Sequence, residues 1–199
     1  MLGIEIIVLI SSIIFIVING MKIRKKTINR GRLIIDIIFF IYLLCVLNIT
    51  IFPIPFQKSF IDSYLNTLGS DPRFKYNLIP FMTVVDSFKN AFTYNTYLLE
   101  LKNIGGNLIL LTPLGIYVHF IKRNLEMKNI LILGFATAMV IELIQLSISL
   151  LLGYSYRSFD VDDLILNTIG FIIGYKSFTL IKNEITKNNF IPSKKESEV

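Results

Sequence analysis

Five long apolar windows are the feature of this sequence that most constrains its fold. They cover residues 2–19, 33–52, 104–121, 130–152 and 163–181. Each has roughly the 20 residues that a helix needs to cross a bilayer core of about 30 Å. A segment in lipid must satisfy its own backbone hydrogen bonds, and no alternating barrel pattern is present, so these windows predict helices. With 53% hydrophobic and 17% charged residues, the sequence predicts an all-α, polytopic membrane protein with about five transmembrane helices.

The basic residues predict how these helices are oriented. Lys and Arg follow the first window rather than precede it, which favours a retained anchor over a cleaved signal peptide. Fourteen of the twenty Lys and Arg residues fall in the first and third connectors and near the C-terminus. The positive-inside rule then places the protein in the cell membrane with its N-terminus outside and its C-terminus in the cytoplasm. The net charge of +6 indicates contact with anionic lipid rather than with nucleic acid.

The second connector, residues 53–103, is the longest and faces outward in this topology. Residues 57–76 predict a loop with a turn at Asp71 and Pro72. After Pro80, apolar residues recur at helical spacing and predict a short amphipathic helix in the membrane interface; they are Phe81, Val84, Val85, Phe88 and Phe92. This helix is either a lid packed on the bundle or a surface that binds an amphiphile. Residues 182–199 predict a polar, loosely ordered cytoplasmic tail.

Several polar side chains occur inside the apolar windows, where an ionisable group costs on the order of 2.5 to 3.5 kcal/mol on insertion scales. Counted by depth, four of them reach the outer half of the membrane from three helices; they are Asn107, Glu142, Gln145 and Asn167. They predict one polar pocket open to the outside. The alternative is that they join helices through hydrogen bonds. Glu142 is then either a protonated structural donor or a functional group, and Arg157 is the basic residue nearest to it in the connector that follows.

Glycine and proline predict close helix packing. Pro113 should kink the third span, and Gly105 with Gly106 opens it. Gly170 and Gly174 form a G-x-x-x-G on the last span. The sequence leaves open whether this face binds a neighbouring helix of the same chain or a second copy in a homo-oligomer.

Three blocks of sequence resemble the VanZ-like family of bacterial membrane proteins. They are NLIPF at 77–81, GNLILLTPLGIYV at 106–118, and IELIQ at 141–145 followed by RSFDVDDLILNTIGFIIGY at 157–175. The resemblance implies a VanZ-like membrane domain over residues 76–181, with the first two helices and an outer loop, residues 1–75, outside it. The family's recurring polar positions correspond to a set of eight residues; they are Asn77, Asn107, Glu142, Gln145, Arg157, Asp160, Asp163 and Asn167.

The founding member of that family is associated with resistance to the lipoglycopeptide teicoplanin. The resemblance therefore implies a non-enzymatic membrane protein that affects the response of the cell envelope to such antibiotics. The expected partners are membrane lipid and a lipoglycopeptide or lipid-linked cell-wall precursor, with no nucleic acid.

Two other classes of function remain open. One is an intramembrane enzyme that acts on an envelope substrate, with Glu142 or Asp163 as acid or base and Arg157 holding a phosphate. In that case Asp160, Asp162 and Asp163 are candidates for holding Mg²⁺. Three acids in a connector more often form a solvated turn and the N-terminal cap of the helix that follows. The other class is a small transporter that uses the break at Pro113. No His/Cys metal spacing or phosphate-binding glycine loop is present, so we expect no cofactor and no metal site.

Overall fold

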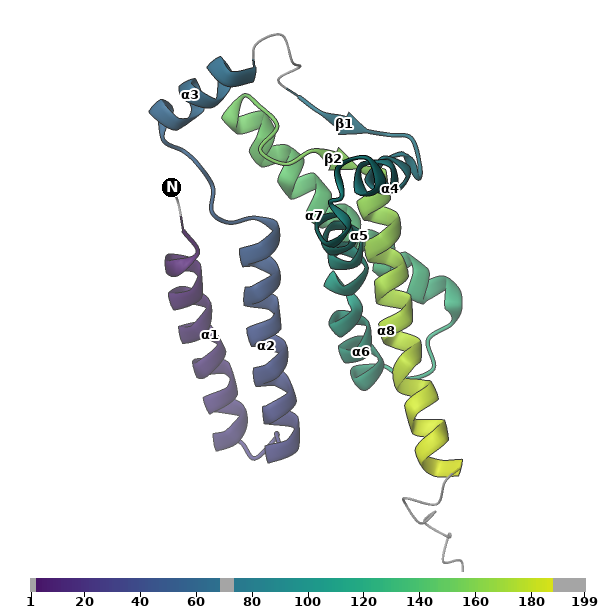
Figure 1. The fold of residues 1–199 in the computed structure, drawn as a ribbon. Helices are drawn as coiled ribbons and strands as arrows, with labels where there is room; N and C mark the ends of the chain where they lie inside the picture. The colour runs from purple at the N-terminus through teal and green to yellow at the C-terminus, as the bar shows by residue number, and fades with distance from the viewer. Residues whose placement is uncertain (1–2, 69–73, 188–199) are drawn as a thin grey trace, which may run out of the picture. The chain divides into compact units, whose positions relative to one another are not determined.

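A computed structural model describes residues 3–68 and 74–187, with side chains described up to residue 178. Helices and two very short strands follow one another along the chain (Figure 1) in this order: α1 (Glu5–Arg24), α2 (Arg30–Thr50), α3 (Lys58–Leu68), β1 (Tyr76–Asn77), α4 (Met82–Tyr94), α5 (Tyr97–Leu110), α6 (Thr112–Ile121), α7 (Met127–Leu152), β2 (Phe159–Asp160) and α8 (Val161–Lys187). Two compact units share these elements. The first unit is Met1–Asp86 with Met139–Asp162, and the second is Ser87–Ala138 with Asp163–Val199.

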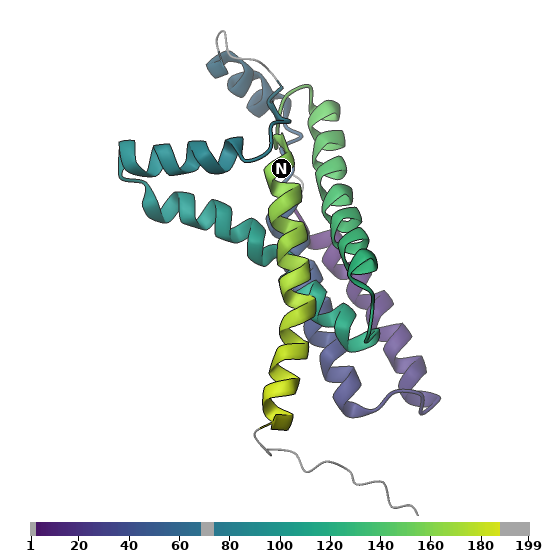
Figure 2. The same ribbon diagram turned by 90° about the vertical axis from the view of Figure 1, so that its right-hand side faces the viewer.

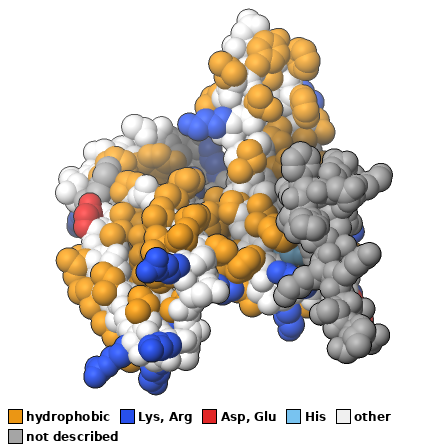
Figure 3. Space-filling model, turned by 90° about the horizontal axis from the view of Figure 1, so that it is seen from below, with side chains coloured by type: hydrophobic (Ala, Val, Ile, Leu, Met, Phe, Trp, Pro, Cys, Tyr) orange, Lys and Arg blue, Asp and Glu red, His pale blue; other side chains and the backbone are white. Residues whose placement is uncertain are grey.

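The prediction of an all-α membrane fold is confirmed. Within the described part of the chain, four helical stretches have the length and hydropathy of a membrane span; they are Glu5–Arg24, Arg30–Thr50, Tyr97–Ile121 and Met127–Leu152. Apolar side chains cover much of the surface seen in Figure 3, as lipid-facing helices require. Helix α8 covers the fifth predicted window. It is not among the four, and its crossing of the membrane stays a prediction.

The predicted loop at 57–76 is wrong for its first half, because residues Lys58–Leu68 form helix α3. Its apolar side chains, among them Phe60, Ile61, Tyr64 and Leu65, recur at helical spacing and form one stripe. Ile61 and Leu65 pack against the core of the first unit, and this packing stabilises a helix in a segment of mixed composition. The turn predicted at Asp71 and Pro72 lies outside the described residues. So do residues 188–199 of the predicted tail, whereas α8 extends beyond Ile181 to Lys187.

The core of the first unit lies where α2 and α7 end. Its buried residues are Ile51, Phe52, Ile54, Leu152 and Tyr154, and side chains of α2, α3 and α7 pack around them, together with Ile4 and Tyr156. Gly153, with φ of 79°, ends α7 in a backbone conformation that glycine adopts without strain. Helix α1 joins this unit through the stacked rings of Phe15 and Phe40, whose centroids are 4.4 Å apart. The first unit is therefore centred on the connectors rather than on the middle of its spans.

In the second unit, the third predicted span is two helices rather than one. Helix α5 ends at Leu110 and α6 begins at Thr112, directly before Pro113 in the first turn of the new helix. This is the position that proline favours, because the N–H it lacks would have no partner there. The interruption predicted at Pro113 is thus present, and the helical segment also begins earlier than predicted, at Tyr97.

Glycines let α8 pack against α5 and α6 with backbones in contact. A Cβ at Gly170 would meet the carbonyl of Leu108, and one at Gly174 would meet the carbonyl of Thr112. The G-x-x-x-G face is therefore occupied within the chain, which answers the question that the sequence left open. Gly105 and Gly106 were expected to support packing, but open space surrounds both of them.

Candidate functional site

A buried carboxylate network begins where β1 and β2 pair in parallel. Their register sets Tyr76 opposite Phe159 and Asn77 opposite Asp160. The Asn77 amide donates to Asp160 Oδ1 at 2.8 Å and to the Thr83 hydroxyl at 2.9 Å. That hydroxyl donates to Asp160 Oδ2 at 2.6 Å. Both oxygens of the buried Asp160 carboxylate thus accept hydrogen bonds, which offsets the cost of removing the charge from water.

Asp162 continues the network and binds the start of α4. Its Oδ1 accepts a hydrogen bond from the N–H of Phe81, and its Oδ2 accepts one from the N–H of Val84 at 3.2 Å. The first N–H groups of a helix have no partner inside it, and a carboxylate there also interacts favourably with the helix dipole. Asp162 therefore caps α4 from a segment far away in sequence. Neither Asp162 nor Thr83 is among the eight predicted site residues.

Glu142 joins the same network from α7. It is 2% exposed, and its Oε2 accepts a hydrogen bond from the N–H of Asp160 at 3.3 Å. We define the carboxylate network by its five residues: Asn77, Thr83, Glu142, Asp160 and Asp162. Three of these, Asn77, Glu142 and Asp160, were predicted from the sequence, and the structure brings them together in the first unit.

Gln145 and Arg157 do something different: they bind the C-terminal end of α2. The Gln145 amide donates to the carbonyl of Thr50, and the Arg157 guanidinium donates to that of Ile49, both at 2.9 Å. The last carbonyls of a helix have no partner inside it, so these donors act as caps. The hydroxyl of Tyr156 extends the set, since its one proton is shared between the carbonyls of Ile51 at 3.1 Å and Pro53 at 2.7 Å. No feature of the sequence identified α2 as their partner.

The remaining three predicted residues lie in the second unit. The Asn107 amide donates to Asp163 Oδ1, which joins α5 to α8. Asn167 lies one turn further along α8 and is 1% exposed. Its side-chain carbonyl has no hydrogen-bond partner among the described residues. The bond between Asn107 and Asp163 holds two helices together, as interhelical amides do in membranes.

The eight predicted residues therefore divide between the two units. The single outward-facing pocket stays a prediction, since five of the residues belong to the first unit and three to the second. Among the described residues, no group of three or more His, Cys, Asp and Glu side chains is arranged to hold a metal ion. Hydrogen bonds from the protein already reach both oxygens of Asp160 and of Asp162.

Comparison with known proteins gives one family. A family model described as VanZ/LLP1 matches residues 39–182. The match contains all eight predicted polar positions and also the second half of α2, where Gln145 and Arg157 bind. It therefore begins well before Tyr76, where the resemblance placed the start of the VanZ-like domain. No curated protein and no solved structure matches the chain.

Proposed function

The chain belongs to the VanZ/LLP1 family, and from that premise we propose that it is a non-enzymatic membrane protein that affects the response of the cell envelope to lipoglycopeptides such as teicoplanin. The carboxylate network is the polar site of this proposal, and it faces outward in the predicted topology. Its role is to hold the start of α4, whose aromatic face meets amphiphiles at the membrane surface.

The observation that carries the proposal is the exposed aromatic face of α4. Phe81, Val85, Phe88 and Phe92 are all exposed, Phe92 at 72%, whereas the small residues Ser87 and Ala91 are buried. The helix thus turns its large apolar side chains away from the protein. An amphipathic helix with this arrangement lies in the membrane interface, where it competes for or binds acyl chains.

Helix α5 enlarges this apolar surface. Figure 2 shows α4 turning back into α5, and the turn is closed by Asn95, with φ of 56°, and by an edge-on contact between the rings of Phe92 and Tyr97. Leu98 and Leu101 on α5 are 84% and 69% exposed. An exposed apolar surface of this kind marks a site of interaction with lipid or with an amphiphile. A lipoglycopeptide is an amphiphile, because it carries an acyl chain.

The hydrogen bonds of the network favour a structural role over a catalytic one. A general acid or base must reach the proton that it transfers. The carboxylates of Asp160 and Asp162 instead point their oxygens at protein donors. Buried carboxylates in such positions fix a backbone conformation, here the start of α4.

Drug susceptibility tests this proposal. A sensitive Gram-positive host would express the wild type, Glu142→Gln, Asp162→Asn or the double variant Phe88→Ser, Phe92→Ser, with membrane levels verified for each. We expect the wild type to raise the inhibitory concentration of teicoplanin more than that of vancomycin, and each variant to lose this protection.

Asp62→Asn is the matched control, because Asp62 is exposed on α3 and is not one of the five residues of the carboxylate network. It should protect as well as the wild type does. Equal susceptibility of wild-type and empty-vector cells would overturn the proposal. Protection that persists in the Phe88, Phe92 double variant would show that the aromatic face of α4 is not needed for the response.

A further inference from the structure

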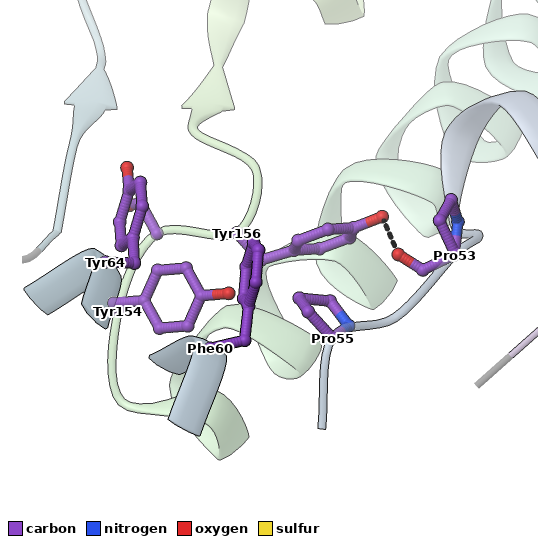
Figure 4. Close-up of a pocket in the computed structure, with 7 residues that line it drawn as sticks. Pro53, Pro55, Phe60, Tyr64, Tyr154 and Tyr156 are labelled. Atoms are coloured by element: carbon purple, nitrogen blue, oxygen red, sulfur yellow. Dashed lines mark hydrogen bonds between the residues drawn. The ribbon is translucent and has the colours of Figure 1, made fainter. Parts of the chain in front are cut away.

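An aromatic cavity lies in the first unit, beside the ends of α2 and α7. Its volume is about 280 Å³, and Figure 4 shows the rings that surround it. We define the aromatic cavity by its lining residues: Pro53, Pro55, Phe60, Tyr64, Tyr154, Ser155 and Tyr156. None of these side chains is charged. The volume is slightly below the roughly 300 to 1,000 Å³ of sites for drug-sized ligands, so the cavity suits one group of a larger molecule.

Tyr154 supplies a polar group that lacks a partner. Its side chain is 3% exposed, and its hydroxyl makes no hydrogen bond with any described residue. Burial, with the nearby Tyr64 and Tyr156 as further causes, raises the pKa of Tyr154, so this hydroxyl keeps its proton and is a donor. In Figure 4 the hydroxyl points toward the rings of Phe60 and Tyr156. A buried donor without an acceptor is unfavourable, and an acceptor on a ligand would remove that penalty.

The other hydroxyls of the cavity are engaged or turned away. Tyr156 donates to the carbonyl of Pro53 at 2.7 Å, the bond drawn in Figure 4. Ser155 accepts a hydrogen bond from the N–H of Lys75 at 2.7 Å. The hydroxyl of Tyr64 points away from the other rings in Figure 4. One donor among apolar walls suits a ligand with a single acceptor oxygen. A sugar ring, with hydroxyls around its rim, would leave most of them unpaired.

The position of the cavity along the chain indicates its depth in the membrane. Five of its seven residues directly follow the C-terminal ends of α2 and α7, two of the candidate spans, and Phe60 and Tyr64 come from α3. Tyrosines gather at this level, where hydrocarbon gives way to the polar interface. Lipids and acylated amphiphiles place at the same depth an apolar chain that ends in a carbonyl.

We propose that the aromatic cavity binds an acyl group, with the Tyr154 hydroxyl donating to its carbonyl oxygen and the rings of Phe60 and Tyr156 packing on the adjoining methylenes. Phe60 stands beside this hydroxyl and is 42% exposed, so an entering chain meets it first. The acyl group comes from a phospholipid ester or from a separate acyl amide. This inference concerns a surface other than α4 and stands independently of any response to lipoglycopeptides.

Photocrosslinking of the full-length protein in lipid nanodiscs tests the proposal. The probe is a decanoyl amide with a diazirine at the end of its chain, and a decane bearing the same diazirine is the comparison that lacks a carbonyl. We expect the amide probe to label the peptides that contain residues 53–64 and 153–157 in preference to the exposed face of α1. In Tyr154→Phe this labelling should fall about three- to tenfold, the loss expected for one hydrogen bond, to the level of the decane probe.

Tyr64→Phe is the matched control, because it also removes one tyrosine hydroxyl, but one that points away from the cavity. Its labelling should equal that of the wild type, and thermal unfolding of both variants would verify that they fold. Unchanged labelling in Tyr154→Phe, or labelling spread evenly over α1 and α2, would overturn the proposal. A phosphatidylcholine with a diazirine on its acyl chain distinguishes the two sources: labelling at the same peptides identifies membrane lipid, and labelling by the amide alone identifies a separate acylated molecule.

Discussion

At the scale of single residues, the polar positions of this chain are mostly anchors for backbone. Asp162 binds the first N–H groups of α4, and Gln145 and Arg157 bind the last carbonyls of α2. Each removes an unsatisfied backbone group at a helix end, where solvent is scarce. The role of these side chains is therefore to fix the start of α4 and the end of α2.

Asp162 gives the sharpest prediction at this scale. Asp162→Ala leaves the N–H groups of Phe81 and Val84 without acceptors and should destabilise the protein by about 2–4 kcal/mol, because two bonds to a charged acceptor are lost. Thermal unfolding in detergent micelles measures this effect. Asp62→Ala, at an exposed position of α3, should change stability little, and equal melting temperatures for the two variants would contradict the capping role.

The sequence identified several buried polar residues, but it did not identify the groups to which they bind. Glu142 and Asp160 could be identified because a carboxylate in or beside an apolar window needs an explanation. Their neighbours could not be, since Asp162 reaches an N–H donor 78 positions away along the chain. A hydrogen bond to a backbone N–H places no requirement on the side chain of that residue, so the sequence does not reveal which residue supplies it. Thr83 was visible only as part of the polar face of a helix.

At the scale of elements, α8 is the surface on which α5 and α6 pack. Gly170 and Gly174 present bare backbone to Leu108 and Thr112, and Gly115 on α6 approaches the backbone of Phe171 in return. Small residues let helices in lipid approach closely, where dispersion and polar contacts act without a hydrophobic driving force. The bond from the Thr112 hydroxyl to the Gly170 carbonyl, at 3.2 Å, lies in this contact.

Gly174→Ala tests this packing. The added methyl group would meet the backbone of Thr112, and we expect a loss of about 1–3 kcal/mol, the usual cost of overpacking, seen as a lower melting temperature in micelles. Gly20→Ala is the control, because open space surrounds Gly20 within α1. It should be neutral or slightly stabilising. Equal melting temperatures for the two variants would show that the α8 contact tolerates a side chain.

The elements that sequence predicted best were those whose signal is local. Long apolar windows gave the spans, and the periodicity after Pro80 gave α4. Helix α3 was missed because its mixed composition resembles a loop, and its stability depends on Ile61 and Leu65 packing against residues distant in sequence. The break at Leu111 followed from Pro113, but the start of α5 at Tyr97 did not, since Glu100 and Lys102 lie outside an apolar window.

At the scale of the whole molecule, the distribution of charge predicts orientation. Lys and Arg crowd the connector between α1 and α2 and the last turn of α1, which contains Lys22 and Arg24. The positive-inside rule places that connector in the cytoplasm and α3 on the outside. This orientation places the aromatic face of α4 on the outer side of the membrane, where the proposed contact with a lipoglycopeptide would occur.

Cysteine labelling of intact cells tests the orientation. The sole cysteine is removed by Cys45→Ala, and a new one is introduced as Thr27→Cys or Ser63→Cys, both at exposed positions. A membrane-impermeant maleimide should label position 63 without lysis and position 27 only after it. The reverse pattern would show that the topology is opposite to the predicted one and that the carboxylate network faces the cytoplasm.

The anchoring of α2 has a consequence for how this protein can diverge. Gln145, Tyr156 and Arg157 bind main-chain oxygens of Ile49, Thr50 and Ile51, and every amino acid carries such an oxygen. These hydrogen bonds do not depend on the side chains of Ile49, Thr50 and Ile51, so substitutions at these positions leave the bonds to α2 intact. Hydrogen bonds of this kind place a requirement on the donor side chains of Gln145, Tyr156 and Arg157 and none on the side chains of Ile49, Thr50 and Ile51.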